Sequence, residues 1–189
     1  MKGRRIMNER ALNKIKHTED QFIERTAENM AAFGVSGTVG RVLGIIYLNK
    51  EPLTLDELSQ ATGMSKTRMS QVVREMLDLN IAEKVFEKGA RRDKYNVEQD
   101  HYQTFISLFS ANWSKIVSRN KITEKKIRRE LLEALEEEGL TEEIEARLNL
   151  LLTETKRWLE YYHWMDSLIE FFESEEIFKH VPKPQSDKD

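Results

Sequence analysis

One stretch of the chain, residues 54–97, constrains the fold most, because several structural signals follow one another there at short spacings. Thr54 and Glu57 have the spacing of a capping box, which starts a helix. Gly63 suits the positive φ of a tight turn, and Ser65 can cap a second helix directly after it. Two short β-prone runs then flank a loop rich in basic residues. Helix, glycine turn, helix and basic hairpin is the order of a winged helix-turn-helix.

The second helix of this motif has an apolar side and a polar side. Met69, Val72, Val73 and Met76 recur at helical spacing and are expected to pack against Leu58 of the first helix. The polar side presents hydroxyls, an amide and cations, which are the groups that bond base edges and phosphates in the major groove. We therefore predict DNA binding through the second helix and the hairpin, with these contact residues: Ser65, Lys66, Thr67, Arg68, Ser70, Gln71, Arg74, Lys88, Arg91 and Arg92.

The charge of the chain is distributed in a way that fits one DNA-binding face. The whole sequence has a net charge of −3, which by itself does not suggest a nucleic-acid partner. Residues 63–94 nevertheless hold eight Lys or Arg against five acids, a local net charge of +3. Residues 95–189 hold thirteen against twenty, a net charge of −7. A basic segment on an acidic scaffold indicates a protein that meets phosphates with one face only.

The sequence around the motif is predominantly helical. Residues 19–33 carry apolar side chains at spacings of three and four and predict an amphipathic helix. The helix that follows contains Gly40 and Gly44, which would let another backbone approach closely. Residues 99–120 and 123–138 predict two more helices.

A long C-terminal helix carries a coiled-coil pattern. From position 144 onward, apolar residues alternate at spacings of four and three, as a helix-packing seam requires. The seam consists of Ile144, Leu148, Leu151, Thr155, Trp158, Tyr162, Met165, Ile169 and Phe172. We therefore expect a mostly α fold: a winged helix-turn-helix with a small β-hairpin wing and a long C-terminal helical dimerisation region, which makes the protein a homodimer.

These patterns predict four parts of the chain. Residues 1–18 are expected to form a flexible N-terminus, and residues 19–98 the winged helix-turn-helix domain with its leading helices. Residues 99–181 would form the helical dimerisation and effector region. Residues 182–189, which contain prolines and polar side chains, are expected to be a disordered tail.

Composition excludes several classes of function. The chain has no cysteine, so disulfides, thiolate metal sites and thiol sensing are excluded. It has no apolar run of about 18 residues and no signal-peptide core, so we expect a cytoplasmic protein without a membrane-spanning segment. The histidines supply neither three metal ligands nor a nucleophile with its base, so we predict no enzyme, metal or cofactor. They are scattered at His17, His101, His163 and His180.

Three segments of the sequence resemble the GbsR branch of MarR-type repressors. They are LSQATGMSKTRMSQVVREML at 58–77, FGVSGTVGRV at 33–42 and VFEKGARR at 85–92. The resemblance extends over about residues 20–181. It implies a homodimeric winged-helix repressor of genes for choline uptake or for conversion of choline to glycine betaine, with choline as the inducer. It also implies an effector site where the winged-helix domain meets the dimerisation helices.

Two aromatic clusters could bind a quaternary ammonium, which donates no hydrogen bond and is held by ring faces. We predict the first cluster as the inducer site, because it lies at the junction implied by the resemblance: Tyr47, Tyr102, Phe105, Phe109 and Trp113, with Phe33 nearby. For each ring, ordinary core packing is the alternative. The second cluster is interpreted as dimer or bundle core: Trp158, Tyr161, Tyr162 and Trp164.

The motif predicts a protein that binds double-stranded DNA, and the resemblance implies a homodimeric transcriptional repressor that responds to choline and controls glycine betaine synthesis or osmoprotectant uptake. Two alternatives stay open. One is a winged-helix regulator that responds to another effector. The other is a protein-binding adaptor without a ligand, whose seam helix would join a partner instead of a second copy.

Overall fold

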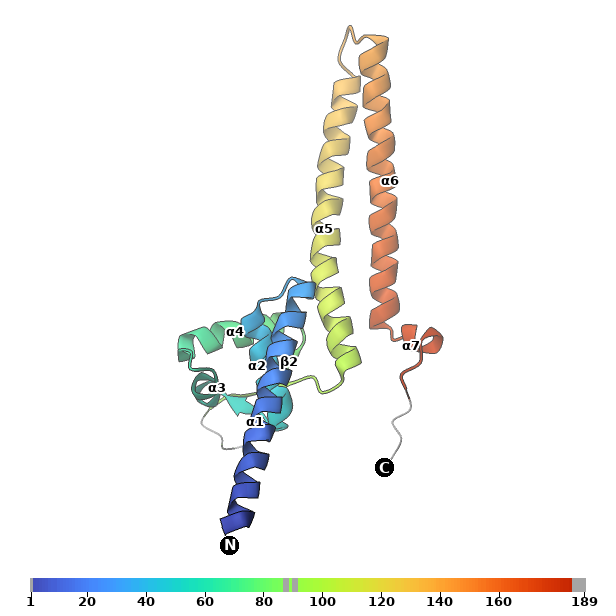
Figure 1. Ribbon diagram of the computed structural model, residues 1–189. Helices are drawn as coiled ribbons and strands as arrows, with labels where there is room; N and C mark the ends of the chain where they lie inside the picture. Colours follow the sequence, from blue (N-terminus) through green and yellow to red (C-terminus); the bar gives the residue numbers. More distant parts are fainter. Residues whose placement is uncertain (1, 87–88, 90–91, 185–189) are drawn as a thin grey trace. The chain divides into compact units, whose positions relative to one another are not determined.

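The computed structural model describes residues 2–86, 89 and 92–184, and it is largely helical with one small sheet (Figure 1). It comprises two compact units, Met1–Leu108 and Phe109–Asp189, each with its own packing. A winged helix followed by long C-terminal helices confirms the predicted fold class. Among the described residues, no helix combines the length and the hydropathy that a membrane span requires.

The first unit contains most of the secondary-structure elements. In chain order they are α1 (Lys2–Met30), the 3-10 turn η1 (Ala31–Phe33), α2 (Gly37–Asn49), β1 (Leu53–Thr54), α3 (Leu55–Thr62), α4 (Lys66–Asp78), β2 (Ala82–Val85) and β3 (Lys94–Val97). Helix α1 begins at Lys2, so the described part of residues 1–18, which we expected to be flexible, is helical. No proline, and no glycine beyond Gly3, interrupts the chain there.

Two glycines let α2 lie against α1. A Cβ built at Gly40 would be 2.6 Å from the Cα of Ala27, and one at Gly44 would be 3.2 Å from the Cα of Ile23. Both distances are too short for a side chain to fit without movement of the α1 backbone. The close approach predicted from these glycines is therefore confirmed, and the partner helix is α1.

The helix-turn-helix forms as its sequence signals predict. The Thr54 hydroxyl accepts a hydrogen bond from the Glu57 amide and the Glu57 carboxylate accepts one from the Thr54 amide, so the capping box of α3 is complete. Gly63 has φ +69° in the turn, and Ser65 caps α4. The residues predicted to pack between α3 and α4 are all buried: Leu58, Met69, Val72, Val73 and Met76. The buried side expected for the first helix also included Leu55 and Ala61, but Leu55 is half-buried and Ala61 is exposed.

The three strands form an antiparallel sheet in the order β1-β3-β2. Strands β2 and β3 are the predicted hairpin, with Ala82 opposite Val97. Strand β1 adds a third strand that the sequence did not predict, and it pairs Leu53 with Tyr95. Since β1 leads directly into α3, the sheet joins the wing to the first helix of the motif. The hairpin tip lies largely outside the described residues.

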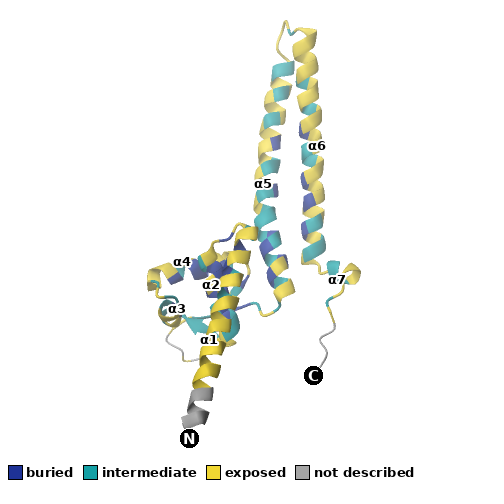
Figure 2. Ribbon diagram, viewed as in Figure 1, coloured by how far each residue is buried: buried dark blue, intermediate teal, exposed yellow. Residues whose placement is uncertain are grey.

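The regular secondary structure in the described part of the second unit is entirely helical. Helix α5 (His101–Leu135) starts in the first unit and continues into the second, followed by α6 (Glu142–Glu173) and α7 (Ile177–His180). Buried and exposed positions alternate along α5 and α6 (Figure 2). The core consists of Val117, Tyr162, Met165 and Ile169, with Phe109, Trp113, Ile116, Trp158 and Leu168 packed against it.

Helix α5 is one element where the sequence predicted two, 99–120 and 123–138. The predicted break at residues 121–122 is wrong, because those residues include no glycine or proline and the backbone continues helically through them. Of the predicted disordered tail, positions 182–184 are described without regular secondary structure, and 185–189 lie outside the described residues.

Candidate DNA interface and effector pocket

Helix α4 presents a polar face to solvent. Ser65, at the start of the helix, and five residues of its first two and a half turns are exposed, namely Lys66, Thr67, Arg68, Gln71 and Arg74, while Ser70 is half-buried. These are all the residues of α4 and its cap that the sequence predicted as DNA contacts. They lie on one face of α4, and the opposite face of the helix is buried in the core. The burial holds the polar face in a fixed orientation.

Three of these side chains form local hydrogen bonds. The Ser65 hydroxyl accepts a hydrogen bond from the Arg68 amide at 3.2 Å, so it stabilises the start of α4 as well as lying on its exposed face. The Arg68 guanidinium donates to the Gln71 Oε1 at 3.4 Å. An arginine and an amide held side by side can present donors and an acceptor together to the edges of neighbouring bases.

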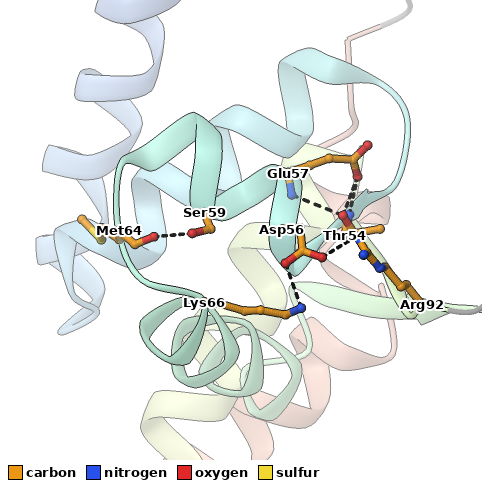
Figure 3. A network of polar contacts seen from close by, with 7 residues as sticks. All are labelled: Thr54, Asp56, Glu57, Ser59, Met64, Lys66 and Arg92. Atoms are coloured by element: carbon orange, nitrogen blue, oxygen red, sulfur yellow. Dashed lines mark hydrogen bonds and ion pairs between the residues drawn. The ribbon is translucent and has the colours of Figure 1, made fainter.

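An acidic residue links α4 to the wing, although the sequence did not single it out. Asp56, in the first turn of α3, receives the Lys66 ammonium on Oδ1 at 2.8 Å and the Arg92 guanidinium on Oδ2 at 2.5 Å (Figure 3). The hydrogen bond from Lys66 is the largest influence that lowers the pKa of Asp56, and the charge of Arg92 adds to it. Ser59 and Met64 brace the turn nearby, since the Ser59 hydroxyl donates to the Met64 carbonyl at 2.5 Å.

The wing contributes its own ion pair. Lys84 on β2 lies 2.8 Å from the Asp93 carboxylate just before β3, and this hydrogen bond raises the pKa of Lys84. Of the wing residues predicted as DNA contacts, Arg92 is described and pairs with Asp56. Lys88 and Arg91 lie outside the described residues.

A separate pocket of about 300 Å³ lies within the first unit, between α1, α2 and the start of α5. Aromatic rings form much of its wall: Phe22, Phe33, Tyr47, His101 and Phe105. The Tyr47 ring stacks with Phe22 at 5.8 Å and with His101 at 4.6 Å, measured between ring centroids. Phe33 meets Phe105 edge to face at 6.0 Å. Polar groups on the wall include Arg25, Asn29 and Glu98.

The predicted inducer rings fall into two groups. Tyr47 and Phe105 line the pocket, whereas Tyr102, one helical turn before Phe105, does not. Phe109 and Trp113 belong to the second unit, where Phe109 lies 4.8 Å from Phe172 between ring centroids.

The pocket also has rings that the sequence did not assign to it. Phe22 and His101 complete the stack on Tyr47, and Phe33, expected only to be nearby, is part of the wall. No local signal marks Phe22 or His101, because each becomes a pocket residue only through packing against a helix distant in sequence.

The cluster predicted as bundle core is only partly covered. Tyr162 is buried and Trp158 half-buried, with their centroids 5.3 Å apart. Tyr161 and Trp164 stack at 6.2 Å, and both are exposed in the single chain.

A winged helix whose second helix has a buried apolar face and an exposed polar one defines the chain as a winged-helix transcription regulator. Two family models agree: residues 33–93 match the MarR family, and residues 101–179 match the C-terminal helical hairpin of the GbsR family of transcriptional regulators. The protein belongs to the GbsR family of MarR-like transcriptional regulators, which confirms the resemblance read from the sequence.

Curated relatives from Bacillus subtilis strain 168 lead to the same family. The chain is 68% identical to the putative HTH-type transcriptional regulator YvaV over 94% of this chain and 100% of YvaV. It is 65% identical to the HTH-type transcriptional repressor OpcR over 94% and 96% of the two chains. For the HTH-type transcriptional repressor GbsR, identity is 32% over 89% and 93%.

Structural comparison supports the fold alone. A crystal structure of a transcriptional regulator covers 88% of this chain and 99% of its own, with a TM-score of 0.55 at 16% identity. The matched families consist of transcriptional regulators, which are not enzymes.

Proposed function

We propose that this regulator is a homodimeric repressor that binds double-stranded DNA through α4 and the wing, and that choline or a related quaternary ammonium releases it. The observation that carries the DNA-binding part is the polar face of α4. Thr67, Arg68, Gln71 and Arg74 are exposed at helical spacing, while the other side of the same helix is anchored by buried residues. A helix held in this way can enter a major groove with its orientation fixed.

The second unit supports a homodimer. In the single chain, large apolar side chains remain exposed on α6, among them Ile144 at 48% and Trp164 at 58%. An open groove of about 580 Å³ lies on this unit, and its apolar wall includes Ile127, Leu131, Leu151, Trp158 and Tyr161. Exposed apolar surface of this kind marks an interaction site. A second copy of the chain carries the same apolar surface. In a two-fold dimer, these identical surfaces pack against each other and cover both.

A dimer also fits the geometry of DNA. Two recognition helices related by a two-fold axis meet half-sites about one helical turn apart, roughly 34 Å. One α4 alone would offer only a few base contacts. The dimer therefore doubles the contacts and sets the spacing that DNA must match.

For the inducer, the aromatic pocket of the first unit is the site we propose. Ring faces attract ammonium groups, and Tyr47 already attracts one, because the Lys50 ammonium lies 3.8 Å from its ring centroid. A ligand's trimethylammonium group could displace Lys50 or use the faces of Phe22, Phe33 and Phe105. Glu98 adds negative charge to the wall, although Arg25 opposes it. Of the five predicted rings, the proposal relies on Tyr47 and Phe105.

Release of DNA would follow from a shift of populations. If the inducer binds more tightly to a dimer whose two α4 helices are wrongly spaced, bound ligand depletes the form that fits DNA. Reversing a 99:1 preference between two states requires about 10⁴-fold discrimination by the ligand. The pocket wall joins α1 and α2 to the start of α5, so ligand binding can act on the helix that continues toward the dimerisation region.

The comparisons favour a repressor more than they favour choline. OpcR and GbsR are both named as transcriptional repressors. Identity to YvaV and OpcR is about twice that to GbsR, so a different effector in the same pocket is the second candidate.

The first experiment is fluorescence anisotropy of the purified protein on DNA from immediately upstream of its own gene, at fixed moderate salt. Choline and glycine betaine are added separately. Binding that choline weakens supports the whole proposal. Tight binding that neither compound changes retains the repressor and rejects this inducer. Absence of binding to this and other DNA would favour the protein-binding adaptor, and light scattering on the isolated chain then tests the dimer.

The pocket has a matched pair of variants. Phe105 and Tyr102 lie on the same helix with nearly equal exposure, 42% and 43%, but only Phe105 lines the pocket. Phe105→Ala should abolish the choline response or raise the choline concentration needed to release DNA by about 10-fold, since a single cation–π contact contributes roughly 0.5 to 2 kcal/mol. Tyr102→Ala should leave the response unchanged. An intact response in Phe105→Ala and Tyr47→Ala would reject the pocket.

A further inference from the structure

Asp56 lies between two cations from different elements, each predicted to contact DNA. Its Oδ1 is 2.8 Å from Lys66 Nζ at the start of α4, and its Oδ2 is 2.5 Å from Arg92 Nη1 beside the wing (Figure 3). Each carboxylate oxygen thus holds one cation. The unesterified oxygens of a DNA phosphate can hold two cations in the same way.

The cluster is open to solvent. The side chains of Asp56, Lys66 and Arg92 are 37%, 59% and 67% exposed. Ion pairs with this exposure contribute little to stability and break readily, so another anion can replace the carboxylate. The pairing is therefore unsuited to a purely structural role and well suited to exchange.

We propose that Asp56 is a specificity-determining residue that acts as an internal substitute for a DNA phosphate. This inference rests on the proposed DNA binding. In the free protein, Asp56 neutralises one of the two positive charges and occupies the donors of both Lys66 and Arg92. As DNA binds, the two cations exchange the carboxylate for phosphate oxygens.

The exchange would affect the occupancy of different DNA sequences unequally. Binding to any duplex must break the Asp56 pairs and bring a carboxylate near phosphates, which costs free energy. The phosphate contacts of Lys66 and Arg92 offset part of that cost on every duplex, and on the operator the base contacts of α4 add to them. Non-specific binding depends almost entirely on phosphate attraction, so the remaining cost is a larger share of its binding free energy. Asp56 would therefore lower the occupancy of other DNA more than that of the operator.

The test compares Asp56→Asn with Asp78→Asn. Both remove one carboxylate from the first unit, but Asp78 is exposed at the last residue of α4 and forms no part of the cluster. Anisotropy is measured on the upstream duplex and on a shuffled duplex of equal length, over a salt series. Asp56→Asn should tighten binding to the shuffled duplex about threefold or more, and steepen its salt dependence by about 0.9 for each additional phosphate that the protein neutralises. Asp78→Asn should change both less.

A second background keeps the test independent of folding effects. In a Lys66→Gln, Arg92→Gln protein, adding Asp56→Asn should not steepen the salt dependence, because no cation remains to be released. Asp56→Glu, which keeps the carboxylate, should behave nearly as wild type.

Several outcomes would overturn the proposal. If Asp56→Asn weakens binding to both duplexes with an unchanged salt dependence, Asp56 is a brace for the wing. If it behaves like Asp78→Asn, its position has no special role. If the wild-type protein binds neither duplex, the proposed function and the role of Asp56 are both overturned. If the wild type binds DNA and Asp56→Asn binds both duplexes with the same affinity and salt dependence as the wild type, only the role of Asp56 is overturned.

Discussion

The two units of the protein bury their apolar residues to very different extents. In the first unit, every apolar residue predicted for the α3–α4 core is covered within one chain, including Leu58 and Met76, which are fully buried. In the second, only Thr155, Tyr162, Met165 and Ile169 of the predicted seam are buried, while Ile144 and Leu151 are exposed. The first unit has a complete core, and the second resembles one side of an interface.

The reason is geometric. Helices α3 and α4 cross each other and are covered by α2 and the sheet, so their apolar faces meet several neighbours. Two long helices side by side can cover only one strip of each other's surface. A stripe wider than that strip, as on α6, is completed only by further helices. The two units should therefore respond differently to mutation.

The largest effect is expected in the first unit. Leu58→Ala removes a fully buried side chain and should lower the free energy of unfolding by about 2–5 kcal/mol. Urea unfolding followed by circular dichroism measures the change. Leu150→Ala, on the exposed side of α6, is the control and should cost less than about 0.5 kcal/mol. An equal cost for both would show that Leu150 is buried in the assembly.

A charge on the seam should act on assembly more than on the fold. Leu151→Glu places a carboxylate on the wall of the apolar groove, where a second copy would bury it. Burial of an unpaired charge is costly, so the dimer dissociation constant should rise by about 10-fold or more. Light scattering over a dilution series measures this. Unchanged dimerisation would mean that the seam does not join two copies.

The second unit contains one buried residue whose replacement should stabilise it. Glu124 is fully buried on α5, and its Oε1 has no hydrogen-bond partner among the described residues. Glu124→Leu should therefore raise the free energy of unfolding by about 1–3 kcal/mol, because an unsatisfied polar group leaves the interior. Thermal unfolding measures the shift. Glu124→Gln, which stays polar, should give a smaller gain, and destabilisation by Leu would point to a hidden partner for Glu124.

The smallest effect is expected from removing a threonine helix cap, which can be done once in each unit. Thr54 caps α3 within the covered motif, and Thr141 caps α6 where residues 141–147 are all exposed. Thr54→Ala should cost about 1 kcal/mol, the usual value for a lost cap. Thr141→Ala should cost less, because fraying of an uncovered helix end loses few contacts. Chemical denaturation of the two variants tests the order, and a reversed order would mean that the start of α6 is more firmly packed than the start of α3.

Much of the first unit could be predicted from the sequence. The capping box, the Gly63 turn, the Ser65 cap and the four buried residues of α4 were all predicted correctly. Their signals lie within a few residues of one another, so local propensity and tertiary packing agree. The exposed polar face of α4 follows directly, because it is the remainder of the same helical pattern.

The long helices were less predictable. An apolar seam of period 3.5 shows that one face of a helix is packed, but it does not identify the packing partner. Another helix of the same chain and a second copy of the chain would both satisfy the pattern. The sequence around residues 121–122 has no breaker, and the single helix α5 was nevertheless missed, since its apolar residues were divided into two periodic runs.

The sequence by itself determined the winged-helix class, the second helix of the motif and its outward residues, because each depends on spacings within one or two helical turns. Only the tertiary structure decided which rings share a pocket and which acid pairs with Lys66 and Arg92. Phe22, Tyr47 and His101 meet across gaps of 25 and 54 residues, and Asp56 reaches Arg92 across 36. Such contacts depend on how α1, α2, α5 and the sheet pack together, and no local pattern records that packing.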